Sequence, residues 1–344
     1  MKKRRRRRGH YSGIGGQAVL EGIMMKNGDR YAVAVRKPDG QIEVEIDEYH
    51  GVLENSGVKK LPFVRGVFNF IDSMILGTKS LNFSATFYEE EENGKKVDPD
   101  KKKRQDKAVA TITTIVAVIL ALGLFMVVPY LITSYLSQSI RNTSLIAILE
   151  GGIRILIFIL YVAGISLMSD IRRVYRYHGA EHKCINCIEK GRELTVENVM
   201  KSSKQHKRCG TSFLLFVMLV SVILFFFIRV ESPIWRLVLR LLLIPVIAGI
   251  SYEIIRLAGR SNSLIIRMIS APGMWLQRLT TKEPDEQVGG VAIKAVEAVF
   301  DWKQFLREEY NYQFPEDIVE DEDTIEEDIV HEEAVNEKQP GAQE

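Results

Sequence analysis

The chain has 344 residues, 26% of them charged, and a formal net charge of +2. These averages suit a soluble protein of one to three domains, but long apolar runs exceed what a soluble core needs and exclude that class. Charge is concentrated at the ends: the seven residues from Lys2 to Arg8 are all basic, whereas residues 316–333 hold eleven acidic residues and no Lys or Arg. Like charges repel one another, so we expect residues 1–9 and 313–344 to be disordered tails.

Residues 10–60 are expected to form a cytosolic glycine-rich loop and a β-hairpin. Glycines surround the run QAVLEGIMMK, but no Lys-Ser or Lys-Thr pair follows them as in a phosphate-binding loop, so we interpret this stretch as a tightly packed loop. Residues 30–36 and 41–47 alternate apolar with polar or small side chains, and the turn Pro38-Asp39-Gly40 separates them. This pattern predicts the hairpin.

An amphipathic helix is predicted for residues 61–88, and a charged linker for residues 89–107. After Pro62, apolar residues fall at positions 64, 67, 68, 71, 74 and 75, which form one broad face of a helix. Such a helix either lies at the membrane surface or packs on membrane-spanning segments.

Four apolar segments in residues 108–260 predict a four-span membrane domain, because a helix of about 20 apolar residues crosses a bilayer. The segments are residues 108–136, 145–168, 212–228 and 234–257. The second carries only Glu150 and Arg154 as charged residues, spaced so that they can pair on one helix face rather than meet lipid singly.

The distribution of basic residues predicts which loops face the cytosol. The loop between the first two spans holds only Arg141, whereas the loop at residues 170–211 holds ten Lys or Arg residues. Basic loops tend to stay in the cytoplasm, so this loop and both termini should be cytosolic. All three cysteines lie in this loop, where a reducing compartment favours metal binding or redox chemistry over a disulfide.

Residues 261–312 are predicted to form an interfacial helix and a C-terminal helix. The first covers residues 262–281, is broken at Ala271-Pro272-Gly273, and would place its basic side chains at headgroup level. The second covers residues 290–310. The predicted fold class is therefore mostly α: a polytopic helical membrane protein with a small cytosolic N-terminal β-hairpin region and amphipathic surface helices.

The loop at residues 170–211 contains half of the six histidines and every cysteine. In a helix over residues 172–190, His178 and His182 would lie one turn apart on one face with Glu181 beside them. Thr195 is a predicted cap for a helix over residues 196–204. His206 and Cys209 follow immediately before the third span, so the cytosolic ends of two antiparallel spans would bring these groups together.

Two zinc sites can be drawn from these residues. One is a closed structural set of Cys184, Cys187, His206 and Cys209, whose spacing is ordinary for zinc. The other uses the HxxEH pattern of zinc peptidases, with the His178 and His182 imidazoles as ligands, Glu181 as the catalytic base, and a third ligand from His206, Cys209 or Glu253. Glu253 could instead pair with Arg256 or Arg208. A metal-free, hydrogen-bonded polar plug between the spans is the third interpretation.

Five phrases occur in order in the chain: GGQAVLEGIMMK, YHGAEHK, HKRCGTSF, YEIIRLAGR and APGMWLQRLTTKEPD. On these phrases the chain resembles, over roughly residues 10–300, the bacterial YqhQ group, the DUF1385 proteins. The resemblance implies a multi-span protein of the bacterial cytoplasmic membrane, described as a predicted metal-dependent enzyme. It marks His178, Glu181, His182, His206 and Cys209 as the motif, whereas Cys184 and Cys187 lie outside it. The resemblance thus favours the His/Glu/Cys site over the closed set.

Two functions follow, and the sequence leaves open whether the protein is an enzyme. The first is a zinc enzyme acting at the inner membrane surface on a small-molecule or lipid-like substrate that no residue identifies. The second is a non-catalytic membrane factor with a structural metal site, whose basic tail from Lys2 to Arg8 binds anionic lipid, the ribosome or the translocation machinery. Transport is a third function class, but four spans with few intramembrane charges would require a homo-oligomer.

Overall fold

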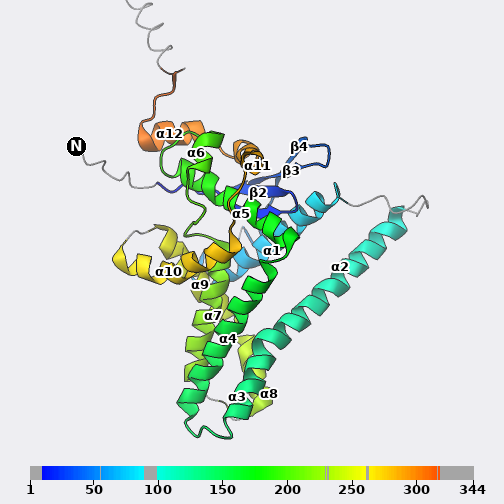
Figure 1. The fold of residues 1–344 in the computed structure, drawn as a ribbon, viewed down its shortest axis with the longest axis vertical. Helices are drawn as coiled ribbons and strands as arrows, with labels where there is room; N and C mark the ends of the chain where they lie inside the picture. Colours follow the sequence, from blue (N-terminus) through cyan, green and yellow to red (C-terminus); the bar gives the residue numbers. More distant parts are fainter. Residues whose placement is uncertain are drawn as a thin grey trace, which may run out of the picture.

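The computed structural model describes residues 10–54, 56–88, 99–228, 230, 232–260, 263–315 and 317. It is a mostly helical protein with a small antiparallel sheet at one end (Figure 1). The predicted basic tail and most of the predicted acidic tail lie outside the described residues. Of the predicted linker, residues 89–98 also lie outside them, whereas residues 99–107 are not a linker but the beginning of a helix.

The sheet contains four strands in the order in which they occur in the chain, each antiparallel to the next. They are β1 (Gly15–Val19), β2 (Gly22–Asn27), β3 (Arg30–Arg36) and β4 (Ile42–Glu48). The predicted hairpin is confirmed as β3 and β4. The predicted glycine-rich loop is wrong for residues 15–27, which form β1 and β2 instead.

Packing on both faces explains why β2 lacks the expected alternation of apolar and polar residues. Its first four residues are all buried, and strands covered on both faces read as continuous apolar runs. Ile23 and Met25 pack in a core with α5 (Ser169–Ile188) and α11 (Glu286–Glu297). Met24 packs on the opposite face with Leu76 of α1 (Val64–Ala85). The sheet therefore lies between α1 and the pair formed by α5 and α11.

Below the sheet in Figure 1, a bundle of long helices extends away from it. The elements are α2 (Pro99–Leu122), a π-helical turn (Gly123–Val127), α3 (Val128–Leu136), α4 (Thr143–Ile165), α7 (Gly210–Phe227), α8 (Pro233–Leu242) and α9 (Ile244–Arg260). Among the described residues, three helical stretches are long and apolar enough to cross a membrane: Thr111–Leu136, Thr143–Ile165 and Gly210–Phe227. These stretches correspond to the first three predicted spans.

The fourth predicted span is divided into two shorter helices, so the count of four is not confirmed. α8 ends at Leu242, Leu243 caps it, and α9 begins at Ile244. Pro245 explains the division, because proline lacks a backbone N–H to continue the first helix and is well tolerated in the first turn of the second. In the bundle, α7 contacts both α4 and α9 (Figure 1).

The remaining elements are a 3₁₀ turn (Gly57–Lys60), α6 (Val196–Met200), α10 (Leu264–Thr280) and α12 (Trp302–Tyr310). The Thr195 side chain accepts a hydrogen bond from Asn198 N, which confirms the predicted cap of α6. The predicted break in α10 is wrong, since the helix continues through Pro272. One C-terminal helix was expected, but α11 and α12 are separate because Asp301 caps a new helix by accepting from Gln304 N.

Candidate metal centre

Two histidines of α5 and one cysteine at the start of α7 come together where the sheet region meets the bundle. His178 and His182 lie one helical turn apart, and their ring centroids are 4.5 Å from each other. Cys209, the N-cap residue of α7, places its Sγ 3.2 Å from His178 Nε2. One ligand atom from each of these three residues lies within 4.8 Å of the others. We call this group the candidate metal centre.

Backbone carbonyls orient both imidazole rings. His178 Nδ1 lies 2.9 Å from the carbonyl oxygen of Thr280 at the end of α10, and His182 Nδ1 lies 2.7 Å from that of Lys204. A carbonyl oxygen only accepts, so each Nδ1 is a donor and Nε2 is the nitrogen left to bind a ligand. Metal-ligating histidines are commonly fixed in this way, with the second ring nitrogen donating to a carbonyl or carboxylate.

The surroundings of Cys209 favour its thiolate form. Its burial alone would raise the pKa of Cys209, but His178 and His182 outweigh that effect and lower this pKa well below its usual range. Burial alone would likewise lower the pKa of His178, but the Cys209 thiolate raises it to about 9. Thr211 Oγ1 lies 3.0 Å from Cys209 Sγ. Because zinc binds thiolate sulfur and imidazole nitrogen, this donor set fits zinc.

Glu181 lies beside this group and is covered by the sheet. Only 6% of Glu181 is exposed, and burial raises its pKa although His182 and His178 oppose that effect. The nearby backbone N–H of Gly16 in β1 favours the charged carboxylate and so also opposes the rise in pKa. A Cβ at Gly16 would lie 3.1 Å from Glu181 Cγ and 2.6 Å from the Met24 carbonyl oxygen. Glycine at this position thus lets β1 approach Glu181 closely.

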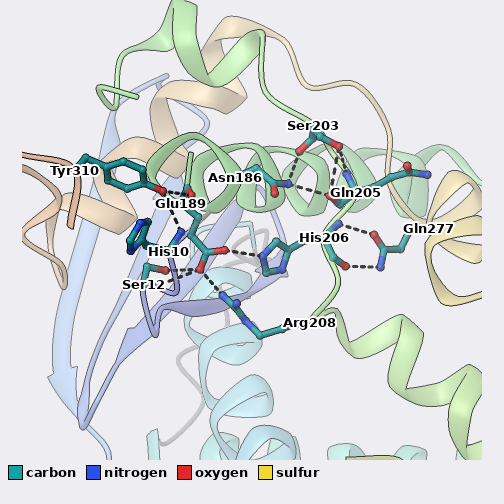
Figure 2. Close-up of polar contacts among 10 residues, drawn as sticks. All are labelled: His10, Ser12, Asn186, Glu189, Ser203, Gln205, His206, Arg208, Gln277 and Tyr310. Carbon is teal, nitrogen blue, oxygen red and sulfur yellow. Dashed lines mark hydrogen bonds and ion pairs between the residues drawn. The ribbon is translucent and has the colours of Figure 1, made fainter. Parts of the chain in front are cut away.

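His206 lies next to the candidate metal centre but is bound to other groups. Its ring centroid is 5.8 Å from that of His182, and its Nε2 lies 3.3 Å from Glu189 Oε2 (Figure 2). Gln277 of α10 fixes the backbone of His206 on both sides, since its amide accepts from His206 N at 2.8 Å and donates to His206 O at 2.7 Å. Glu189 and Gln277 therefore set the position of the segment that leads to Cys209.

Glu189 collects polar contacts from three parts of the chain (Figure 2). Its Oε1 accepts from Ser12 N, Ser12 Oγ and Arg208 at 3.0, 2.9 and 2.6 Å. Burial alone would raise the pKa of Glu189, but the His206 hydrogen bond and the Arg208 charge lower it to about 2. We did not predict Glu189, Ser12 or Gln277 as site residues. The phrase HKRCGTSF contains two of the groups bound to Glu189, and the phrase APGMWLQRLTTKEPD contains Gln277, but neither marked these roles.

The structure does not bring Glu253 to the candidate metal centre. Its carboxylate pairs with Arg65 of α1 at 2.6 and 2.5 Å, and with Arg256 at 3.8 Å. The Arg256 pair is the alternative that the sequence had left open. Glu253 thus ties α9 to α1.

Cys184 and Cys187 lie on the other face of α5, in the core beneath the sheet. Both are fully buried, and burial raises the pKa of Cys184 well above its usual range and that of Cys187 to about 11. Protonated thiols among apolar side chains are poor metal ligands. Within the part of the chain that the structure describes, the closed set of three cysteines and His206 does not assemble.

The fold and this group define a class: a helical protein with membrane-length helices, a small sheet and a buried His/Cys cluster between them. The chain belongs to the DUF1385 family, since the family model described as "Protein of unknown function (DUF1385)" matches residues 61–302. It is 36% identical over 289 residues to "Uncharacterized protein YqhQ" of Bacillus subtilis (strain 168), covering 82% of this chain and 90% of that protein. No solved structure matches the chain. The family membership expected from the five phrases is thereby confirmed.

Proposed function

We propose that this protein is an integral protein of the bacterial cytoplasmic membrane that crosses the bilayer four times and holds a zinc ion at its cytosolic face. Three membrane-length helices and the ten basic residues of the loop at residues 170–211 support this orientation. α8 and α9 together would make the fourth crossing, since α9 packs along α7 and α8 lies at the end of the bundle away from the sheet (Figure 1). Both termini would then be cytosolic.

The arrangement of His178, His182 and Cys209 carries the metal proposal. Zinc lies about 2.0–2.3 Å from its nitrogen and sulfur ligands, so neighbouring donors in a tetrahedral site are about 3.5 Å apart. The three donor atoms here lie within 4.8 Å of one another, which small side-chain rotations can adjust. The carbonyls of Thr280 and Lys204 hold both rings in the orientation that zinc ligation requires.

Three protein ligands leave a fourth position, and this is the pattern of catalytic zinc sites. A zinc ion with such an open position makes a bound water acidic and polarises a substrate oxygen. Glu181 would accept a proton on its carboxylate, because burial raises its pKa above the ordinary value. Glu189 would hold His206 away from the fourth position through its Oε2. We therefore propose hydrolysis at the inner membrane surface as the reaction class.

A second function, a non-catalytic membrane factor with a structural metal, is favoured by the burial of the site. His182 is 1% exposed and Cys209 is 3% exposed, which restricts access for a substrate. If the His206 ring bound the metal instead of Glu189, it would close the coordination sphere. In this function the basic tail from Lys2 to Arg8, which lies outside the described residues, would bind anionic lipid, the ribosome or the translocation machinery.

Metal content of the purified full-length protein tests the site. We expect about one zinc ion per chain in the wild type, by analogy with sites of this ligand set, and loss of that ion in His178→Ala/His182→Ala. Cys184→Ala/Cys187→Ala is the matched double variant on the same helix and should retain the metal. Loss of metal in the cysteine variant alone would refute the assignment.

X-ray absorption at the zinc edge then separates the two functions. A sphere of one sulfur, two imidazoles and one water oxygen would support the enzyme. In that case Glu181→Gln should retain zinc but lose in vivo function. A third imidazole or a second sulfur in a four-ligand sphere would instead support the structural metal. Retained function in Glu181→Gln would contradict a hydrolytic role for Glu181.

A further inference from the structure

A cluster of charged side chains is buried inside the helical bundle, separate from the candidate metal centre. Glu150 and Arg154 lie one turn apart on α4, and Arg240 comes from α8. Glu150 Oε1 is 3.0 Å from an Arg154 nitrogen and 2.5 Å from an Arg240 nitrogen. The three side chains are only 11%, 5% and 10% exposed. Two guanidinium groups thus face one carboxylate, and these three side chains together carry a net charge of +1.

The cluster lies near one end of the bundle. Glu150 is seven residues from Thr143, the first residue of α4, which is about 10 Å along a helix. Phe225, two residues before the end of α7, lies beneath both guanidinium groups, at 5.2 Å from Arg154 and 5.0 Å from Arg240. In Figure 1 this end carries α8 and α3, and the sheet lies at the other end. If the bundle crosses a membrane as proposed above, the cluster lies just inside the face opposite the candidate metal centre.

Arg154 has hydrogen-bonding capacity that the described protein groups do not use. Arg154 donates to Glu150 and, at 3.4 Å, to Ser221, but its buried Nε has no hydrogen-bond partner. The Phe225 ring attracts both cations through its π face but accepts no strong hydrogen bond. An unbalanced positive charge is costly in a low-dielectric bundle, and a second anion would relieve that cost.

A small cavity beside Arg240 offers room for part of such an anion. It has a volume of about 10 Å³, and its lining residues are Phe225, Ile228, Val230, Leu239 and Arg240. A volume of about 10–15 Å³ holds one water-sized group, and a buried water needs two to four polar partners. Among the described lining residues Arg240 alone has a polar side chain, so a water would be poorly bound, whereas a negatively charged oxygen would be attracted by the full charge of the guanidinium.

We infer that Arg240, with the charge of the neighbouring Arg154 behind it, binds the phosphate group of an anionic membrane lipid, one of whose oxygens enters this cavity. The surroundings favour a lipid over a free anion. α8 exposes Ile234, Trp235 and Leu242 at 74%, 66% and 68%, a surface suited to acyl chains with a Trp at the membrane boundary. Long arginine side chains near the end of a membrane-spanning helix commonly reach lipid phosphates. The inference rests on the proposed membrane crossing but not on the metal.

Native mass spectrometry of the full-length protein, released from bilayers of known composition, tests this inference. The probes are phosphatidylglycerol and phosphatidylcholine at equal amounts, with inorganic phosphate and chloride in a separate arm. We expect phosphatidylglycerol to be retained preferentially, and Arg240→Gln to reduce its retention about five-fold, the effect of removing one basic residue near a membrane surface. Arg141→Gln removes an exposed basic residue from the loop before α4 and should retain the lipid.

Three results would overturn the inference: equal retention of the two lipids by the wild type, equal retention by Arg240→Gln and Arg141→Gln, or displacement of the lipid by millimolar inorganic phosphate or chloride. The last result would make this a soluble-anion site. If Arg240→Gln fails to fold, as judged by circular dichroism, the headgroup comparison in the wild type decides alone. Zinc content of the same samples reports separately on the metal proposal, and extraction without detergent would instead contradict the membrane crossing.

Discussion

Replacing Glu189 by Gln should destabilise the protein at neutral pH, because the charged carboxylate is bound far more tightly in the folded state than in the unfolded chain. The pKa of Glu189 falls from its ordinary value of 4.5 to about 2, as the His206 and Arg208 contacts outweigh burial. Each pKa unit is worth about 1.4 kcal/mol, so the charged form contributes about 3 kcal/mol to folding at pH 7. The side chain is only 13% exposed, so solvent screening reduces this little.

The direction of the pKa shift of Glu189 determines how the stability difference should change with pH. A depressed carboxylate pKa stabilises the folded state above the unfolded pKa of about 4.5, and the effect is lost as the pH falls toward 2. In thermal unfolding of the detergent-solubilised protein, Glu189→Gln should lower the Tm by about 5 °C at pH 7. The difference from wild type should stay constant above about pH 5 and shrink toward pH 3.

Glu197→Gln is the matched control, since Glu197 makes an ion pair with Lys201 but its side chain is 76% exposed. Solvent-exposed ion pairs contribute little to stability, so this variant should unfold like the wild type. Equal Tm values for Glu189→Gln and the wild type, or equal losses in both variants, would refute the reasoning. So would a difference that grows as the pH falls.

Two further predictions concern packing and the metal ligands. Gly179→Ala should lower the free energy of unfolding by about 1–3 kcal/mol, because a Cβ there would lie 2.1 Å from the Lys282 carbonyl oxygen. Gly152→Ala is the control: a Cβ there meets nothing within 4 Å, so the Tm should be unchanged or higher. A Gly152→Ala loss as large as that of Gly179→Ala would contradict the contact. Glu253→Gln should leave the zinc content at the wild-type level, since Glu253 binds Arg65; loss of zinc in elemental analysis would restore Glu253 as a ligand.

Local patterns predicted the helices and one hairpin, and tertiary contacts decided the rest. The first three predicted spans follow from the length of uninterrupted apolar runs, and the β3–β4 hairpin follows from the alternation of apolar and polar residues. β1 and β2 were missed because the second strand is covered on both faces, so burial hides its alternation. The division between α8 and α9 was readable, since Pro245 stands inside the fourth apolar segment. We nevertheless predicted one span, because the whole apolar segment is long enough to cross a bilayer.

For the candidate site too, some contacts follow from local sequence patterns and others only from the tertiary fold. The i, i+4 spacing of His178 and His182 in a helix is local, so the sequence predicts that their rings are neighbours. The groups that orient the rings are backbone carbonyls of Thr280 and Lys204. Any residue type supplies such a carbonyl, so no sequence pattern marks it. Glu189 was missed because its partners come from three distant segments.

The cysteines of α5 show why spacing alone leaves two zinc sites open. Successive residues of an α-helix are about 100° apart, so Cys184 lies about 200° around the axis from His182 and faces the opposite side. That side packs under the sheet against α11, where burial keeps the thiol protonated. Cys209 is close to His178 only because it caps α7, whose start meets α5 in the fold. The helix period excludes a site that joins both faces of α5, and the choice of face required knowing which side the sheet covers.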